Sequence, residues 1–212
     1  FSIVSYTGTD TNGTVGHGLS QAPELLIIKD RDHDGTSWAV GSDEMSSWTY
    51  SMELDTTDAE AAVASRFNGT APTSSVFSIG TSGYTNQIGE IIAYCFHSVE
   101  GYSKVGSYKG NGNADGPFVY TGFKPAWVMV KKTDGTESWA IYDDARDVAG
   151  NPNEKGLYVD SYAAENDASG RYKDFVSNGF KIRGTSGEQN SSGGTYMFMA
   201  FAATPFKYSN AR

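Results

Sequence analysis

The second half of the chain repeats the first half in the same order. Three segments of the first half return about 100 residues later with their apolar and polar positions aligned. The pairs are Ala22–Lys29 with Lys124–Lys131, Ser37–Val40 with Ser138–Ile141, and Leu54–Glu60 with Val159–Glu165. The spacing between partners changes by only a few residues, as it does when insertions fall in loops. The sequence therefore predicts a tandem duplication, with one repeat over residues 1–100 and a second over residues 103–212.

Each repeat has the pattern of a small β domain. The apolar runs Glu24–Lys29 and Ala126–Lys131 are each followed by a polar turn and a second short strand, which predicts a hairpin. The chain has 25 glycines and 13 tyrosines, residues that favour turns and strands over helix interiors. Only residues 57–64, and more weakly 163–167, have a helical pattern. We expect an all-β chain of two tandem β-sandwich-like repeats packed together, with at most one short helix per repeat.

Charge and hydropathy exclude two classes of partner. The chain has 16 Lys and Arg against 25 Asp and Glu, a net charge of −9, and no basic cluster. Nucleic-acid binding depends on neutralising phosphates, so we expect none. No apolar stretch approaches the roughly 18 residues that a membrane-spanning helix needs, so we expect no membrane insertion. Cys95 is the only cysteine, which excludes an intrachain disulfide and a cysteine metal cluster.

Several phrases of the sequence carry a family resemblance. They are Gly106–Gly112, Asp115–Phe123, Asp174–Lys181 and Ala200–Lys207. They resemble a repeated domain of unknown function that is found near the C-terminus of large proteins of marine bacteriophages, including cyanophages. Those large proteins are commonly labelled tail fibre or virion structural proteins. The resemblance implies a virion-exposed β domain of a tail fibre or another appendage, and therefore a location on the virion. It supplies no catalytic residue.

One loop has the spacing of a calcium site. Asp30, Asp32 and Asp34 alternate and are followed by Gly35, an arrangement that suits a hard cation with oxygen ligands. The twelfth position of such a loop needs a bidentate Glu, but Gly41 occupies it, and the second repeat has Lys132-Thr133-Asp134-Gly135 at the equivalent turn, so the repeat does not require a metal there. A solvated hairpin turn is the alternative interpretation. We expect no cofactor, with calcium at this loop as the one candidate ion.

Aromatic residues are the candidate ligand contacts. Trp38 and Trp139 occupy matching positions in the two repeats, which predicts that both belong to the core. Four further rings lie outside matched strands and are candidates for stacking on sugar faces: Trp48, Tyr50, Tyr158 and Tyr162. The alternative for each of these rings is that it covers an edge of the core.

Three functional hypotheses follow. The first is a non-enzymatic phage appendage domain that attaches to a host surface, with a cell-surface glycan as partner. The second is a capsid-decoration or fibre-spacer domain that contacts other virion proteins and has no receptor. The third is a glycan-degrading enzyme, which would need two carboxylates across one groove. A homo-oligomer fits the first two hypotheses, although the chain has no heptad segment to drive it.

Overall fold

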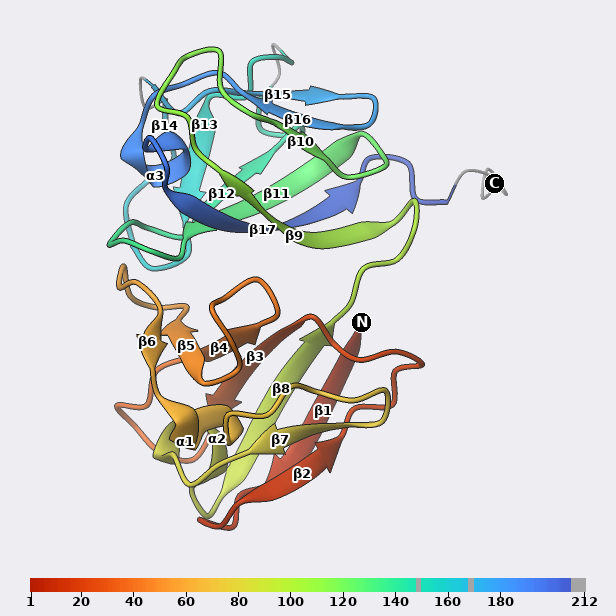
Figure 1. Cartoon of the computed structure of the whole chain (residues 1–212), viewed down its shortest axis with the longest axis vertical. Helices are drawn as coiled ribbons and strands as arrows, with labels where there is room; N and C mark the ends of the chain where they lie inside the picture. Colours follow the sequence, from red (N-terminus) through yellow and green to blue (C-terminus); the bar gives the residue numbers. More distant parts are fainter. Residues whose placement is uncertain (148–149, 168–169, 207–212) are drawn as a thin grey trace. The chain divides into compact units, whose positions relative to one another are not determined.

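The computed structural model describes residues 1–147, 150–167 and 170–206, and it confirms the all-β class (Figure 1). The chain divides into two compact units, Phe1–His97 and Ser98–Arg212. In every strand pair of the described residues the strands run antiparallel. The described part of the chain contains no helix long and apolar enough to cross a membrane.

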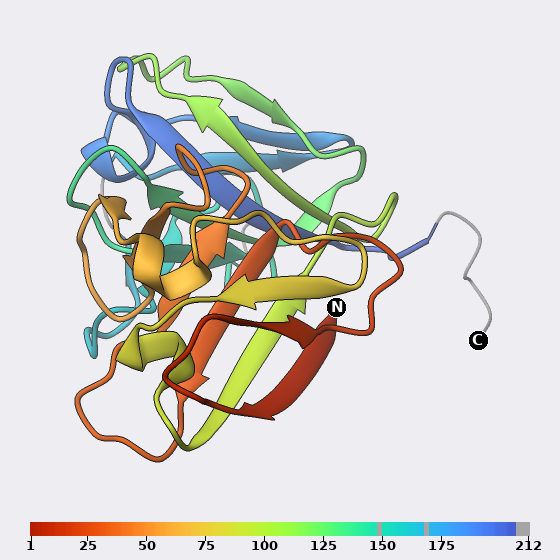
Figure 2. The same cartoon turned by 60° about the horizontal axis from the view of Figure 1, so that its bottom comes forward.

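The first unit is built on a six-stranded sheet. Its strands, in spatial order, are β1 (Ser2–Thr7), β8 (Glu90–Phe96), β3 (Leu25–Asp30), β4 (Ala39–Ser42), β5 (Tyr50–Glu53) and β6 (Ala61–Ala62). A two-stranded sheet of β2 (Gly13–Gly16) and β7 (Val76–Ile79), with helices α1 (Ala64–Phe67) and α2 (Gly83–Asn86), covers one face (Figure 2). The core lies between these layers and includes Leu26, Ile28, Phe77 and Ile91.

The second unit has a six-stranded and a three-stranded sheet. The larger sheet has the order β14 (Asn166–Asp167), β13 (Lys155–Tyr158), β12 (Ala140–Asp143), β11 (Pro125–Lys132), β17 (Thr195–Ala202) and β9 (Ser103–Lys109). The smaller sheet has the order β10 (Phe118–Tyr120), β16 (Gly179–Ile182) and β15 (Lys173–Val176), and α3 (Gly187–Asn190) lies beside it. The core between the sheets includes Val128, Phe180 and Phe198.

The two large sheets share one strand order. In each unit the first strand (β1 or β9) pairs with the last (β8 or β17), and the last strand pairs with the third (β3 or β11). The next three strands in the chain then follow in order to the edge of the sheet. Individual contacts also recur. The Asn86 side chain donates to Gly80 O and accepts from Thr9 N, and Asn190 donates to Gly184 O and accepts from Asn111 N. This correspondence supports the tandem duplication that the sequence predicts.

The hairpin predictions are confirmed and the helix predictions are wrong. The pairs β3–β4 and β11–β12 form as expected. Residues 57–60 have no regular structure, residues 61–62 form β6, and α1 begins only at Ala64. The first unit also has two short helices instead of at most one, and residues 166–167 pair as β14. The Ala-rich segment is too short to stabilise a helix by itself, and strand pairing with Tyr50 and Ser51 satisfies its backbone instead.

Candidate functional site

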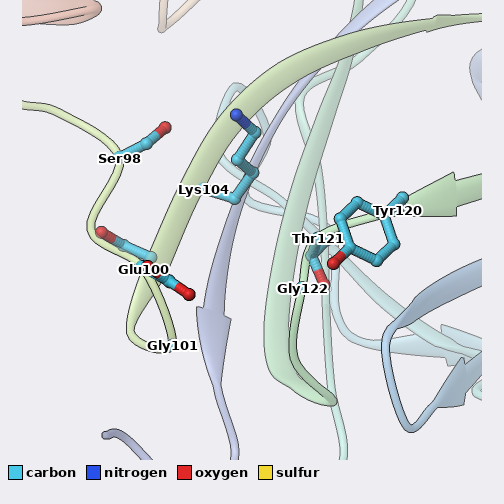
Figure 3. A pocket seen from close by; sticks show the side chains of 8 residues that line it. Ser98, Glu100, Gly101, Lys104, Tyr120, Thr121 and Gly122 are labelled. Carbon is cyan, nitrogen blue, oxygen red and sulfur yellow. The ribbon is translucent and has the colours of Figure 1, made fainter.

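An open pocket lies in the second unit and has a volume of about 390 Å³ (Figure 3). Two chain turns and the start of β9 line it. The lining residues are Ser98, Glu100, Gly101, Ser103, Lys104, Tyr120, Thr121 and Gly122. Its size is that of a small-ligand site.

The turn before β9 forms one wall. Val99 and Ser103 pair through two backbone hydrogen bonds of 3.0 Å, which close the turn between them. Gly101 lies inside this turn at φ 71°, a left-handed conformation that glycine adopts without strain. Ser98 Oγ accepts a hydrogen bond from Val105 N at 3.1 Å and ties the turn to β9. The wall is therefore fixed by backbone contacts, and the Glu100 side chain projects from it.

The turn after β10 forms the opposite wall. Thr121 N and Gly122 N both donate to Asn178 O, at 3.0 and 3.2 Å, and Thr121 Oγ1 donates to Phe123 O at 2.6 Å. These bonds fix the chain directly after Tyr120, the last residue of the strand. Alternation along β10 buries Val119 and turns Phe118 and Tyr120 outward. The Tyr120 ring is 66% exposed and stands across the pocket from Glu100 (Figure 3).

The pocket combines one aromatic face with two opposite charges. Glu100 is exposed and Lys104 is half-buried. Within the described residues neither side chain forms a hydrogen bond or an ion pair. Both charges are therefore available to a ligand that lies against the Tyr120 ring. An exposed ring beside polar groups suits a sugar, because the ring covers the apolar sugar face while the polar groups reach its hydroxyls.

Residues 1–205 match the family described as "Domain of unknown function (DUF7483)". The chain belongs to the DUF7483 family. The family match thus spans both units. The chain matches no curated protein and no solved structure.

The rings predicted from the DUF7483 sequence lie in four different environments. The prediction of an exposed ring is wrong for Trp48, which is 6% exposed. Its ring packs on Phe67 at 5.5 Å, and Nε1 donates to Asp43 Oδ1 at 2.7 Å. Tyr50 is half-buried at the start of β5. Both residues belong to the first unit, whereas the residues that line the pocket belong to the second.

The two candidates of the second unit are also outside the pocket lining. Tyr158 is half-buried, and its hydroxyl donates to Glu188 Oε2 at 3.0 Å, so it belongs to an internal network. Tyr162 is fully exposed in a segment without regular structure. Among the two tryptophans expected in the core, Trp139 is buried as predicted, whereas Trp38 is half-buried with its ring 6.2 Å from that of Tyr94.

The Asp30 loop is held by its own backbone. Asp30 is buried, and its Oδ1 accepts from Asp32 N at 2.9 Å and His33 N at 3.1 Å. Asp32 Oδ2 accepts from Glu90 N at 2.7 Å, while Asp34 is exposed. Within residues 1–147, 150–167 and 170–206, no three His, Cys, Asp or Glu side chains form a group that could hold a metal ion. Two of the three carboxylates thus act as turn acceptors, and calcium binding here stays a prediction.

Sequence reasoning missed the three side chains that give the pocket its character: Glu100, Lys104 and Tyr120. Glu100 lies at the end of the first repeat and Lys104 in the first strand of the second, and neither belongs to a pattern typical of a binding site. Tyr120 could have been found from the sequence, because two aromatic residues flank a valine in the segment Phe118-Val119-Tyr120. Such alternation places both rings on one face of a short strand when the middle residue is buried.

Proposed function

We propose that this domain is a non-enzymatic binding module whose pocket in the second unit takes a glycan. One observation carries the proposal: an exposed aromatic ring, Tyr120, stands across an open pocket from a carboxylate, with an ammonium group beside it. The pocket walls are fixed by backbone hydrogen bonds, so a ligand need not order them on binding. The site therefore favours a rigid saccharide over a flexible chain.

The biological setting that we propose is attachment of a phage particle to its host. Its support is the resemblance of the repeated phrases to domains of phage tail fibre and virion structural proteins. The partner would then be a cell-surface glycan, and the domain would be exposed on the virion. The exposed Tyr120 ring and the two opposite charges of the pocket fit such a glycan. They favour binding at Tyr120 over binding at the four aromatic residues that the sequence analysis proposed.

A spacer or decoration role is the second candidate. It is favoured by the shared strand order of the two units and by recurrent contacts such as those of Asn86 and Asn190. Two similar units can present the same kind of surface twice to a symmetric assembly. A spacer needs no ligand pocket, so binding at Tyr120 separates the two candidates.

The test is glycan-array and host-cell binding by the whole chain and by two tyrosine variants. Tyr120→Ala removes the ring that lines the pocket, whereas Tyr162→Ala removes a more exposed ring outside the lining and serves as the control. We expect Tyr120→Ala to weaken binding about fivefold or more, since a planar ligand stacked on an aromatic side chain contributes about 1–3 kcal/mol, as measured for nucleobases. Tyr162→Ala should bind as the wild type does.

Two further arms decide between the alternatives. Equal binding by both variants would overturn the pocket as the site, and no binding by the intact fold would favour the spacer role. Incubation with host polysaccharide would reveal turnover if the domain were a glycan-degrading enzyme. Parallel runs with calcium and with a chelator test the Asp30 loop.

A further inference from the structure

The core of the second unit encloses an amine and an amide whose polar atoms are left without partners. Lys173 is 0% exposed and Asn153 is 1% exposed. Lys173 Nζ and Asn153 Oδ1 are both buried and have no hydrogen-bond partner among the described residues. An unpaired polar atom in a core is destabilising, and more so if it is charged. Two such atoms on neighbouring side chains therefore need an explanation.

The backbone holds these two residues directly opposite one another. Asn153 N donates to Lys173 O at 2.7 Å, and Lys173 N donates to Asn153 O at 3.2 Å, which together form an isolated antiparallel bridge. Opposed residues of such a pair project their side chains on the same side of the ladder, with Cβ atoms about 5 Å apart. The Asn153 side chain lies against the Lys173 backbone, because Nδ2 donates to Lys173 O at 3.4 Å and to Asn151 Oδ1 at 3.2 Å.

An aromatic ring and a buried acid complete the surroundings. Lys173 Nζ lies 3.0 Å from the centre of the Tyr142 ring. The Tyr142 hydroxyl donates to Glu188 Oε1 at 3.4 Å, and Glu188 is 4% exposed. Arg171 Nε lies 3.0 Å from Glu188 Oε2. The lysine amine, the asparagine amide and the glutamic acid are thus enclosed in one water-poor site.

Burial sets the protonation of this site. Burial lowers the pKa of Lys173 well below its ordinary value, and the nearby Glu188 carboxylate offsets this only in part. Burial raises the pKa of Glu188, against the lowering effects of Arg171 and Lys173. Burial therefore favours the neutral form of the amine, which is a nucleophile, and makes the Glu188 carboxylate a better proton acceptor.

We propose that Lys173 and Asn153 join through an intramolecular amide bond, with Glu188 transferring the proton. The Lys173 Nζ lone pair attacks Asn153 Cγ and forms the new C–N bond. Glu188 takes a proton from Nζ and delivers it to the departing Nδ2, while the Cγ–Nδ2 bond breaks. One ammonia leaves, Glu188 regains its starting form, and no atom is oxidised or reduced. The product converts both unpaired atoms into one buried amide.

The first unit shows that this fold can fill the same region with apolar side chains. Gly41 follows the segment that aligns with the one before Tyr142. A side chain at Gly41 would collide with the rings of Phe67 and Trp48, whose nearest atoms lie 2.7 Å from the position that its Cβ would take. The first unit thus packs two aromatic rings where the second has Tyr142 beneath Lys173. Because the apolar solution exists in the same fold, stability alone does not call for the polar group.

Mass spectrometry of the denatured whole chain tests the bond. The wild type is expected to be lighter than its sequence mass by one ammonia, about 17 Da. A tryptic digest should contain one branched product joining Asp147–Lys155 to Tyr172–Lys181, because trypsin cannot cleave after an acylated Lys173. Intact mass equal to the sequence mass, with Asp147–Lys155, Tyr172–Lys173 and Asp174–Lys181 as three separate linear peptides from a chain shown to be folded, would overturn the proposal.

Variants assign the roles. Lys173→Met and Asn153→Ala should each restore the full sequence mass, and Glu188→Gln should do so with the partners still present. Asn153→Asp should lose water instead of ammonia and arrive at the same product mass as the wild type, which a merely structural asparagine would not do. Lys132→Ala, a change at a half-buried lysine outside the site, should keep the ammonia loss. If a variant fails to fold, the wild-type mass and branched peptide still decide.

Discussion

At the scale of single residues, Trp48 separates a core role from a ligand role. Its ring is packed edge-on to Phe67, and its indole nitrogen donates to Asp43. The segment around it, Ser46–Ser51, is polar on either side, which is typical of a loop. Sequence therefore shows no reason for burial, because the apolar partner Phe67 lies further along the chain and only the tertiary fold brings it close.

Trp48→Ala should therefore act on stability and not on ligand contact. We expect the free energy of unfolding of the first unit to fall by about 3–5 kcal/mol, the usual cost of deleting a large aromatic core side chain. Urea unfolding followed by circular dichroism measures this change. Tyr162→Ala, an exposed control, should stay within about 0.5 kcal/mol of the wild type. A Trp48→Ala variant as stable as the control would show that the ring is not part of the core.

The Asp30 loop shows a second limit at this scale. Alternating carboxylates have the same spacing whether they bind a cation or cap a turn. Only the backbone path reveals that Asp30 accepts from the two amides of Asp32 and His33 and that Asp32 accepts from Glu90 N. Asp134 Oδ2 likewise accepts from Thr195 N in the second unit, so this contact does not depend on the calcium-like motif.

At the scale of elements, an arginine in each unit contacts one acid and one aromatic residue, but the elements that supply these two residues are interchanged between the units. In the first unit Arg66 forms an ion pair with Glu53 on β5 and stacks over Tyr84 of α2. In the second unit Arg171 forms an ion pair with Glu188 of α3 and stacks over Tyr158 on β13. Strand register relates these positions, since Glu53 pairs with Ala39 and Tyr158 pairs with Ala140. In each unit the arginine therefore contacts one carboxylate and one aromatic ring. In the first unit the acid lies on a strand and the ring on a helix, and in the second unit the reverse holds.

This exchange predicts strong coupling between Glu53 and Tyr84. Glu53→Tyr should cost about 3 kcal/mol, because it leaves the buried Arg66 guanidinium without its carboxylate. Tyr84→Glu alone should also destabilise, because it places a second carboxylate beside Glu53. The double variant recreates the arrangement of the second unit, and its loss should be smaller than the sum by at least about 1 kcal/mol. Urea unfolding of the four proteins measures the cycle, and additive losses would contradict it.

Element prediction succeeded where a local pattern decides the structure and failed where a distant partner does. The apolar runs of β3 and β11 and their following turns are local, so both hairpins follow from sequence. Residues 57–64 carry good helix formers, yet their pairing partner on β5 determines a short strand there. Lys173 likewise has the neighbours of a solvated lysine, and its burial depends on Asn153 and Tyr142 from other elements.

At the scale of the whole molecule, both units bury tyrosine hydroxyls in the same way. Tyr6 donates to Thr85 O at 2.6 Å in the first unit, and Tyr108 donates to Gln189 O at 2.9 Å in the second. Burial raises the pKa of both phenols above the ordinary value, and it does the same for Tyr142. We therefore expect both units to lose folding stability at alkaline pH.

The sign follows from proton counts. Below about pH 10 these phenols are protonated in both the folded and the unfolded chain, so they add no pH dependence. Above that pH the unfolded chain releases protons that the folded chain retains, and the free energy of unfolding falls as pH rises towards the raised pKa values. We expect circular dichroism to show unfolding above about pH 10, together with a cooperative rise in tyrosinate absorbance.

Tyr108→Phe should make the loss of stability with pH less steep, because the folded chain then retains one proton fewer. The variant also costs about 1 kcal/mol at neutral pH through the lost hydrogen bond. Gradual ionisation of all the tyrosines with the fold intact would contradict the burial of these hydroxyls.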